Sequence, residues 1–106
     1  MEHLINELKT SMVAIQALSI YDYQQHKFIF EDKGLPNVTF LTTMAKENCF
    51  EESSFLYLET DDKHFFLRIH PGKQILAIVQ LDTEKTYNKV ILEHKCASML
   101  EEVSTS

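Results

Sequence analysis

The sequence predicts an α+β domain in which five antiparallel strands form one sheet sandwiched between helices. Three observations lead to this fold class. Residues 55–82 read FLYLETDDKHFFLRIHPGKQILAIVQLD, which is three short apolar runs separated by two polar turns. Segments at both ends and in the middle carry apolar side chains at helical spacing. Two expected strands are apolar on both faces, so helices must cover both sides of the sheet.

The first part of the chain predicts a short helix followed by a hairpin. Residues 1–12 place apolar side chains on one helical face, and a helix this short needs packing to be stable. Residues 13–23 are apolar on both parities, which favours a strand covered on both faces. Good helix formers in this run leave a helix open as the alternative. A polar turn over 21–26 then leads to a second strand over 27–31.

A central helix is expected from Val38 to about Asn48. Asn37 can act as its N-cap, because an Asn side chain accepts a free amide of the first turn. Threonines at 39, 42 and 43 lower its intrinsic helicity, so packing must hold the helix in place.

The stretch 55–82 predicts an antiparallel meander. Phe65, Leu67 and Ile69 alternate onto one face of its second strand, and the polar residues of that strand share the other face with Phe66. A Pro-Gly pair supplies the next turn. The run 75–81 is almost wholly apolar and is therefore expected at the centre of the sheet, where we expect Val79→Asp to unfold the domain.

A last helix is expected from Glu84 to about Val103, with Asp82 or Thr83 as its cap. Its buried stripe is expected to contain Leu92, Cys96, Met99, Leu100 and Val103. Tyr87, Val90 and Ile91 are expected to widen that stripe at its start.

Composition limits the classes of function. The 106 residues predict a single domain over positions 1–106. The net charge of −6 argues against nucleic-acid binding, which needs a basic surface. No apolar run approaches the roughly 20 residues that span a bilayer, and the first residues do not resemble a signal peptide. Two widely spaced cysteines favour reduced thiols, so we expect a cytoplasmic protein without membrane insertion.

Candidate catalytic or metal-binding residues do not form a recognisable set. His64 and His70 share a strand face but lie about 20 Å apart, too far to bind one metal ion. The carboxylate pairs are adjacent in sequence and lie in turns or near a chain end, where solvation is their usual role. Two glycines cannot build a phosphate-binding loop. We therefore expect a protein that is not an enzyme and needs no cofactor or metal.

The first strand of the meander is the candidate interface. Phe55 and Tyr57 share one of its faces, and aromatic residues are enriched at interface cores. This strand follows a helix rather than a hairpin, so we expect it at a sheet edge, which must be paired or covered. The sequence-based expectation is that Tyr57→Glu yields a folded monomer.

The order α-β-β-α-β-β-β-α, the chain length and the meander followed by a long helix resemble the Roadblock/dynein light chain family, whose fold is profilin-like. The first hairpin differs, because it carries YDYQQH in place of an Asp-Gly type of turn. The resemblance implies a non-catalytic homodimer, or a heterodimer with a Roadblock-like paralogue. It also implies binding to a small Ras-like GTPase or to a motor or signalling complex. Mapped onto this chain, the implied interface contains Phe40, Thr43, Met44, Glu47, Phe55, Tyr57 and Glu59.

Two other functions fit the sequence. Its small size and acidic charge also suit a secretion-type chaperone, although such chaperones usually place three strands before the central helix. A ligand-sensing domain of the profilin-like or PAS-like kind would need an internal cavity.

Overall fold

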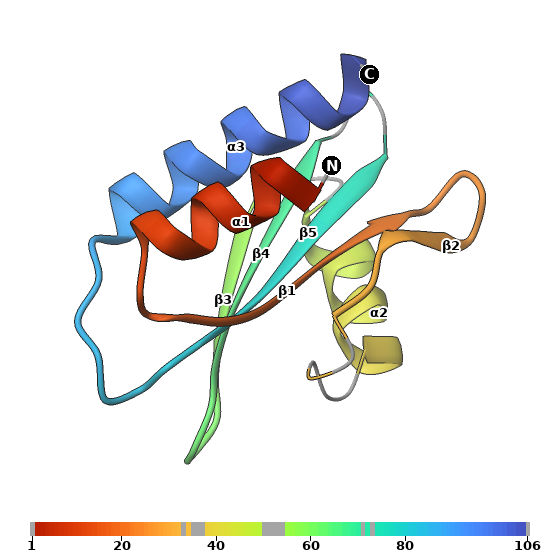
Figure 1. Cartoon of the computed structure of the whole chain (residues 1–106). Coiled ribbons are helices and arrows are strands. Elements are labelled where there is room, and N and C mark those ends of the chain that lie inside the picture. Colours follow the sequence, from red (N-terminus) through yellow and green to blue (C-terminus); the bar gives the residue numbers. More distant parts are fainter. Residues whose placement is uncertain are drawn as a thin grey trace.

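The computed structural model describes residues 2–32, 34, 38–49, 55–70, 72 and 74–105, and the side chains of 48, 49, 104 and 105 lie outside this description. Within these ranges the chain forms three helices and five strands (Figure 1). They are α1 (Glu2–Ser11), β1 (Ile15–Asp22), β2 (Lys27–Phe30), α2 (Val38–Cys49), β3 (Phe55–Glu59), β4 (His64–His70), β5 (Ile75–Leu81) and α3 (Lys89–Thr105). None of the described helices is long and apolar enough to cross a membrane.

The strands form one antiparallel sheet in the order β2-β1-β5-β4-β3. The most apolar strand, β5, lies in the middle, where Val79 pairs with Leu18 of β1 and with Phe66 of β4. Every residue of β5 except Gln80 is buried. The predicted α+β class and the central position of this strand are thus confirmed.

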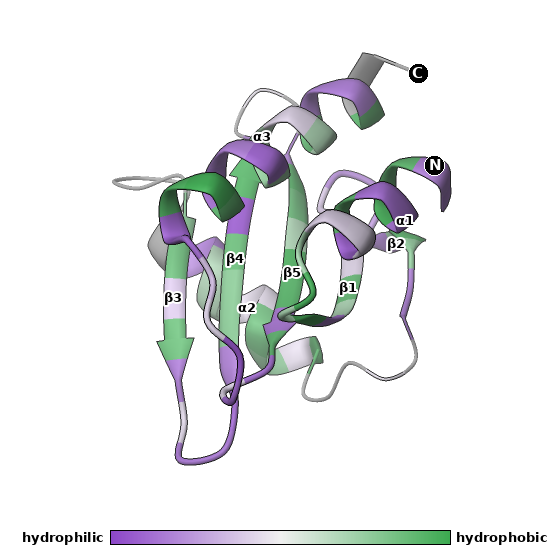
Figure 2. Cartoon of the chain, turned by 60° about the vertical axis from the view of Figure 1, so that its left-hand side comes forward, coloured by the Kyte–Doolittle hydropathy of each residue, from purple (hydrophilic) through white to green (hydrophobic). Residues whose placement is uncertain are grey.

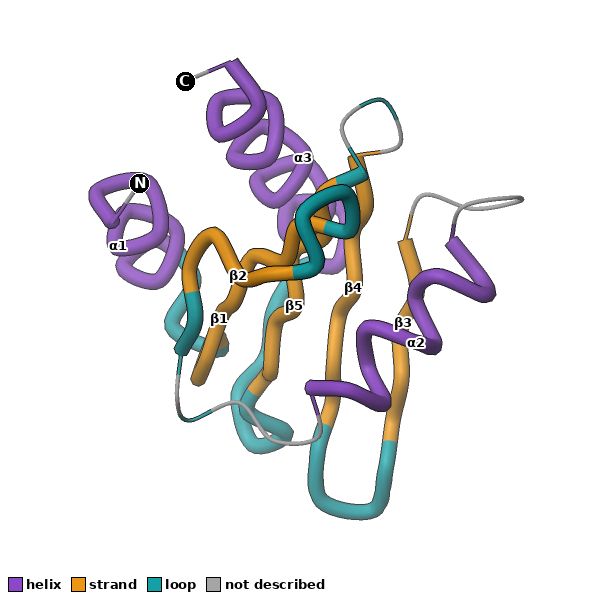
Figure 3. Tube along the Cα trace, turned by 90° about the vertical axis from the view of Figure 1, so that its right-hand side faces the viewer, coloured by secondary structure: helices purple, strands orange, loops and turns teal. Residues whose placement is uncertain are grey.

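Helices cover both faces of the sheet, and each face has its own apolar core. Helices α1 and α3 lie on one face and α2 on the other, as Figures 1 and 3 show. Figure 2 shows the mainly apolar strands β3, β4 and β5 side by side. Strand β4 divides its side chains between the two cores: Phe66 faces α1 and α3, whereas Phe65, Leu67 and Ile69 face α2. The alternation predicted for β4 is confirmed.

The hairpin of β1 and β2 differs from the prediction at its ends. Strand β1 begins at Ile15, because the chain turns after α1 and the Ile15 amide donates to the Met12 carbonyl, 3.1 Å away. Val13, predicted to lie in the strand, is 68% exposed. Strand β2 ends at Phe30. The first half of β1 extends past this end and lies beside the side chain of Asp32, which accepts the Leu18 amide at 3.3 Å.

The prediction for the start of α3 was wrong. The helix begins at Lys89, and Asn88 caps it: its Oδ1 accepts the amides of Val90 at 2.9 Å and Ile91 at 3.1 Å. Asp82 instead accepts the Glu84 amide within a turn, so Glu84 precedes the helix. Val90 and Ile91 are exposed, and Tyr87 lies before the helix. The N-cap predicted for α2, Asn37, lies outside the described residues.

Replacing Val79 by Asp is expected to unfold the domain. Val79 is fully buried in β5, and a carboxylate there would have no water and no cationic partner. We expect a loss of more than about 4 kcal/mol in the free energy of unfolding. Circular dichroism and urea denaturation measure this, with Val13→Asp as the matched exposed control; a cooperative transition retained in Val79→Asp would contradict the central position of β5.

Replacing Asn88 by Ala should remove the cap of α3. The amides of Val90 and Ile91 would lose their acceptor, and we expect a loss of about 1 kcal/mol in the free energy of unfolding. Asn88→Asp keeps an acceptor oxygen and should retain most of the stability. If Asp82→Ala proved far more costly than Asn88→Ala in urea denaturation, the assigned start of α3 would be wrong.

Candidate protein interface

Strand β3 forms one edge of the sheet. Among the described residues it pairs with β4 alone, from Phe55 opposite Arg68 to Glu59 opposite His64. The other edge strand, β2, pairs with β1 only over Ile20 to Asp22. An edge strand presents backbone donors and acceptors on its outer side, so β3 offers a template for pairing with another chain.

Helix α2 lies beside this edge and turns an apolar residue to solvent. Leu41 and Ala45 are buried against the sheet, and Phe40 on the outer side is 59% exposed. Thr43 and Glu47 follow at helical spacing and are exposed, and Met44 is half-buried. The hydroxyls of Thr42 and Thr43 donate to the Thr39 carbonyl, at 3.0 and 2.9 Å. The outer face of α2 therefore combines an exposed aromatic ring with small side chains, a combination that suits close packing against a partner.

The side chains of β3 divide between the two faces of the sheet. Leu56 and Leu58 pack toward α2, whereas Phe55 and Tyr57 pack toward α3. The Tyr57 ring lies 4.9 Å from that of Phe66, and Lys89 Nζ lies 4.8 Å from the Tyr57 ring centroid. These contacts place Tyr57 beneath the start of α3, half-buried in the chain's own core.

Burial also changes the acid–base behaviour of this region. It raises the pKa of Tyr57 to about 12, and the negative forms of Tyr87, Cys96 and Glu93 add to the shift. The pKa of Tyr87 is raised as well, by burial first and by Glu59 second. Both phenols therefore stay neutral at physiological pH; both pack against the core, and the Tyr57 hydroxyl also donates a hydrogen bond to the Lys89 carbonyl.

The residues predicted for the interface fall into two groups on opposite faces of the sheet. Phe40, Thr43, Met44 and Glu47 lie on α2, and Phe55 and Tyr57 lie on the α3 side, with the backbone of β3 between the two groups. Glu59 is exposed at the end of β3. A charge at position 57 would meet Phe66 as well as the edge, so Tyr57→Glu cannot separate assembly from folding. Phe40 gives the cleaner test.

The sequence prediction missed two exposed apolar residues, Val90 and Ile91, which are 63% and 47% exposed. They lie in the first turn of α3, next to Lys89, whose carbonyl accepts the Tyr57 hydroxyl at 3.3 Å. The cap at Asn88 was the signal that could have found them, because a helix starting there turns both side chains away from the buried Leu92.

An ion pair and a histidine–carboxylate contact hold α3 over β4. Arg68 Nη1 lies 2.9 Å from Glu93 Oε1, and His70 Nε2 lies 2.9 Å from Glu101 Oε1. The single arginine of the chain is thus used within the fold, although its buried Nε has no hydrogen-bond partner. Cys96 is fully buried nearby, and burial raises the pKa of its thiol to about 12, against the influence of Arg68. This thiol is therefore an unreactive core residue.

The remaining candidate residues do not converge on a site. Among the described residues, no three His, Cys, Asp or Glu side chains are placed to hold a metal ion. Asp61 and Asp62 are exposed in the turn between β3 and β4, and the Glu101 carboxylate contacts the His70 ring. Glu51, Glu52 and the side chain of Cys49 lie outside the described residues.

Comparison of this chain with protein-family models, curated proteins and solved structures finds no match.

The raised pKa of Tyr57 predicts a specific loss of stability in alkali. A folded-state pKa of about 12, above the usual value of 10.0, favours folding below pH 10 and ceases to do so as pH rises toward 12. Tyr57→Phe keeps the ring and should show a smaller fall in urea midpoint between pH 9 and 11 than the unmodified chain. Equal slopes for the two proteins would contradict the raised pKa of the Tyr57 hydroxyl.

Proposed function

We propose that the protein is a non-catalytic, dimeric scaffold or regulator that pairs through α2 and β3 with a second copy or a Roadblock-like paralogue. The single observation that carries this proposal is the open edge of β3 together with the exposed Phe40 of α2, the helix that packs against β3 and β4. Pairing two such edges would satisfy backbone groups and bury two phenylalanine rings at once. Because a two-fold interface contains each residue twice, the stabilisation from even a modest contact counts twice.

The difference between the two sheet edges supports this choice of surface. Edge strand β2 has four residues and begins with Lys27, and short charged strands are poor templates for pairing. Edge strand β3 reads FLYLE and carries no basic residue. Only the β3 edge, among those described, combines an apolar strand with an exposed aromatic residue on the neighbouring helix.

The partner class follows from the resemblance described above. Members of the Roadblock/dynein light chain family, which the chain resembles, bind small Ras-like GTPases or motor and signalling complexes, and we propose the same partners here, in the cytoplasm. The two strands before α2, rather than three, favour this proposal over a secretion-type chaperone. Leu92, Cys96 and Leu100 are buried between α3 and the sheet, which speaks against a ligand cavity there.

Replacing Phe40 by Glu is expected to dissociate the dimer without unfolding the domain. The change places a charge where the proposal buries an aromatic ring, at a cost of at least ~1.5 kcal/mol in each copy. We expect the dimer dissociation constant to rise roughly 100-fold or more. Sedimentation equilibrium over a micromolar concentration series measures it.

The matched control is Val13→Glu, since Val13 is 68% exposed and lies in the turn after α1, away from β3. It should leave the association unchanged. A monomeric unmodified chain at all concentrations, or equal effects of Phe40→Glu and Val13→Glu, would refute the assigned surface.

The GTPase partner is tested separately by affinity capture from the source cells. The tagged chain should retain a small GTPase, identified by mass spectrometry and by bound guanine nucleotide. Recovery of a motor or signalling subunit without a GTPase would support the other partner class named above, and recovery of a secreted effector would refute the scaffold role.

A further inference from the structure

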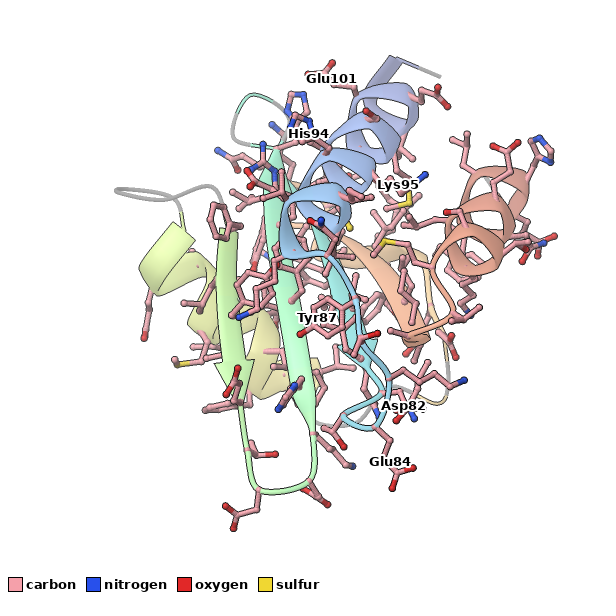
Figure 4. All side chains as sticks on the ribbon, turned by 90° about the vertical axis from the view of Figure 1, so that its left-hand side faces the viewer. Asp82, Glu84, Tyr87, His94, Lys95 and Glu101 are labelled. Atoms are coloured by element: carbon pink, nitrogen blue, oxygen red, sulfur yellow. The ribbon has the colours of Figure 1, made fainter. Side chains whose placement is uncertain are left out.

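The two faces of the sheet are covered unequally at the β3 edge. Helix α2 packs mainly against β3 and β4, whereas α3 packs mainly against β4 and β5. Figure 4 shows the α3 side, where β3 lies beside α3 rather than beneath it. Phe55 and Tyr57 point to this side and are half-buried. Each chain therefore leaves an apolar ledge, one strand wide, along the α3 side of β3; we call it the β3 ledge.

The β3–β4 hairpin determines which backbone groups of β3 face outward. The Thr60 amide donates to the Lys63 carbonyl at 2.8 Å, so these two residues form a hydrogen-bonded pair. Hydrogen-bonded and non-hydrogen-bonded pairs alternate along an antiparallel ladder, so Tyr57 opposite Phe66 is a non-hydrogen-bonded pair. The backbone N–H and C=O of Tyr57 therefore point away from β4, toward the open side of the edge.

Two copies that pair through these groups run antiparallel about a two-fold axis perpendicular to the sheet. This arrangement is the dimer proposed above, on which the present inference rests. It puts both copies of α2 on one face of the joined sheet and both copies of α3 on the other. The two β3 ledges then lie side by side on the α3 face.

The spacing of the strands gives the distance between the helices of the two copies. Neighbouring strands lie about 4.8 Å apart. Because α2 lies over β3 and β4, the two copies of α2 would be about two strand spacings apart, roughly 10 Å, which is the distance of helices in direct contact. Because α3 lies over β4 and β5, its two copies would be about four spacings apart, roughly 19 Å. That gap admits one further helix, about 8–10 Å from each copy of α3.

The side of α3 that borders this gap carries an exposed apolar residue. Val90 and Glu93 are spaced i, i+3 and so share a side of the helix, and Glu93 pairs with Arg68 of β4. Val90 is 63% exposed. Its neighbour Ile91 shares the other side of α3 with Lys95, which extends toward α1 in Figure 4. Only Val90 of these two apolar residues therefore borders the β3 ledge.

We propose that the two joined β3 ledges form a trough that binds one amphipathic helix of a partner protein, so that two chains hold one helix. Its floor consists of Phe55 and Tyr57 from both copies, and Val90 of each copy lies on a wall. This floor is aromatic and uncharged, so it selects a helix with large apolar residues along one face. Since the trough crosses the two-fold axis, a bound helix excludes a second one.

A defined peptide tests the trough. The probe is a fluorescein-labelled, Ala-rich peptide of about 18 residues, long enough to be helical in water, with leucines along one face at i, i+4, i+7 and i+11. A control peptide has the same composition with its leucines distributed around the helix. Fluorescence anisotropy, at chain concentrations where sedimentation shows the dimer, should saturate at one probe peptide per two chains. The control peptide should bind roughly tenfold more weakly or worse.

Three substitutions separate the trough from the dimer. Val90→Glu places a charge on the trough wall and should weaken binding of the probe roughly tenfold or more, while the dimer persists. Ile91→Glu is the matched control, because Ile91 is 47% exposed on the α1 side of the same helix turn, and it should not change binding. Phe40→Glu lies on the opposite face and should abolish binding because it dissociates the dimer. Circular dichroism verifies that each variant is folded.

The outcomes distinguish the trough from the dimer on which it rests. A chain that is monomeric at every concentration overturns both. A dimer that binds neither peptide, binds both equally, or saturates at two peptides per dimer overturns the trough alone. Binding that survives in a monomeric Phe40→Glu variant, or equal effects of Val90→Glu and Ile91→Glu, would likewise overturn the trough.

Discussion

The burial of β5 on both faces is the constraint on which the rest of the structure depends. Ile75 to Val79 are at most 4% exposed, and a strand of this composition is stable only in the middle of a sheet with helices above and below it. That requirement places β1 and β4 on its two sides and assigns α2 to one face and α1 with α3 to the other. The polar contacts then fix details: Arg68 and His70 of β4 hold α3, and Lys9 holds α1 to Asp32 at 2.8 Å.

A sheet with β5 at its centre has two edge strands, β2 and β3, and these two edges differ in structure. At the β2 edge the strand is short. Beyond it, the Asp32 carboxylate accepts the Leu18 amide of β1, which a longer β2 would have paired. Burial of Asp32 alone would raise its pKa, but hydrogen bonds from Lys9 and from the Gly34 and Leu18 amides outweigh this effect and lower it. This carboxylate therefore stays ionised and blocks the edge near neutral pH. The β3 edge has no comparable charged cap among the described residues, which is why assembly is proposed there.

The predictability of the fold follows from local signals. Strands β4 and β5 were predicted at the residues where they occur, because alternation and a Pro-Gly turn mark them without ambiguity. The start of α3 was mispredicted because Asp82 and Asn88 can both cap a helix, and only packing against the sheet decides between them. The edge position of β3 was predicted from connectivity. The side chains of Phe55 and Tyr57 point away from α2, and this direction could not be predicted, because alternation does not reveal which helix covers which face.

Hydrogen exchange of the β3 backbone tests the central claim most directly. The amides of residues 55–59 should exchange more slowly as the protein concentration rises through the micromolar range, because strand pairing between copies protects an edge. The amides of β2, residues 27–30, serve as the internal control and should not change. Exchange at 55–59 that is independent of concentration, or protection that rises equally at both edges, would contradict assembly through β3.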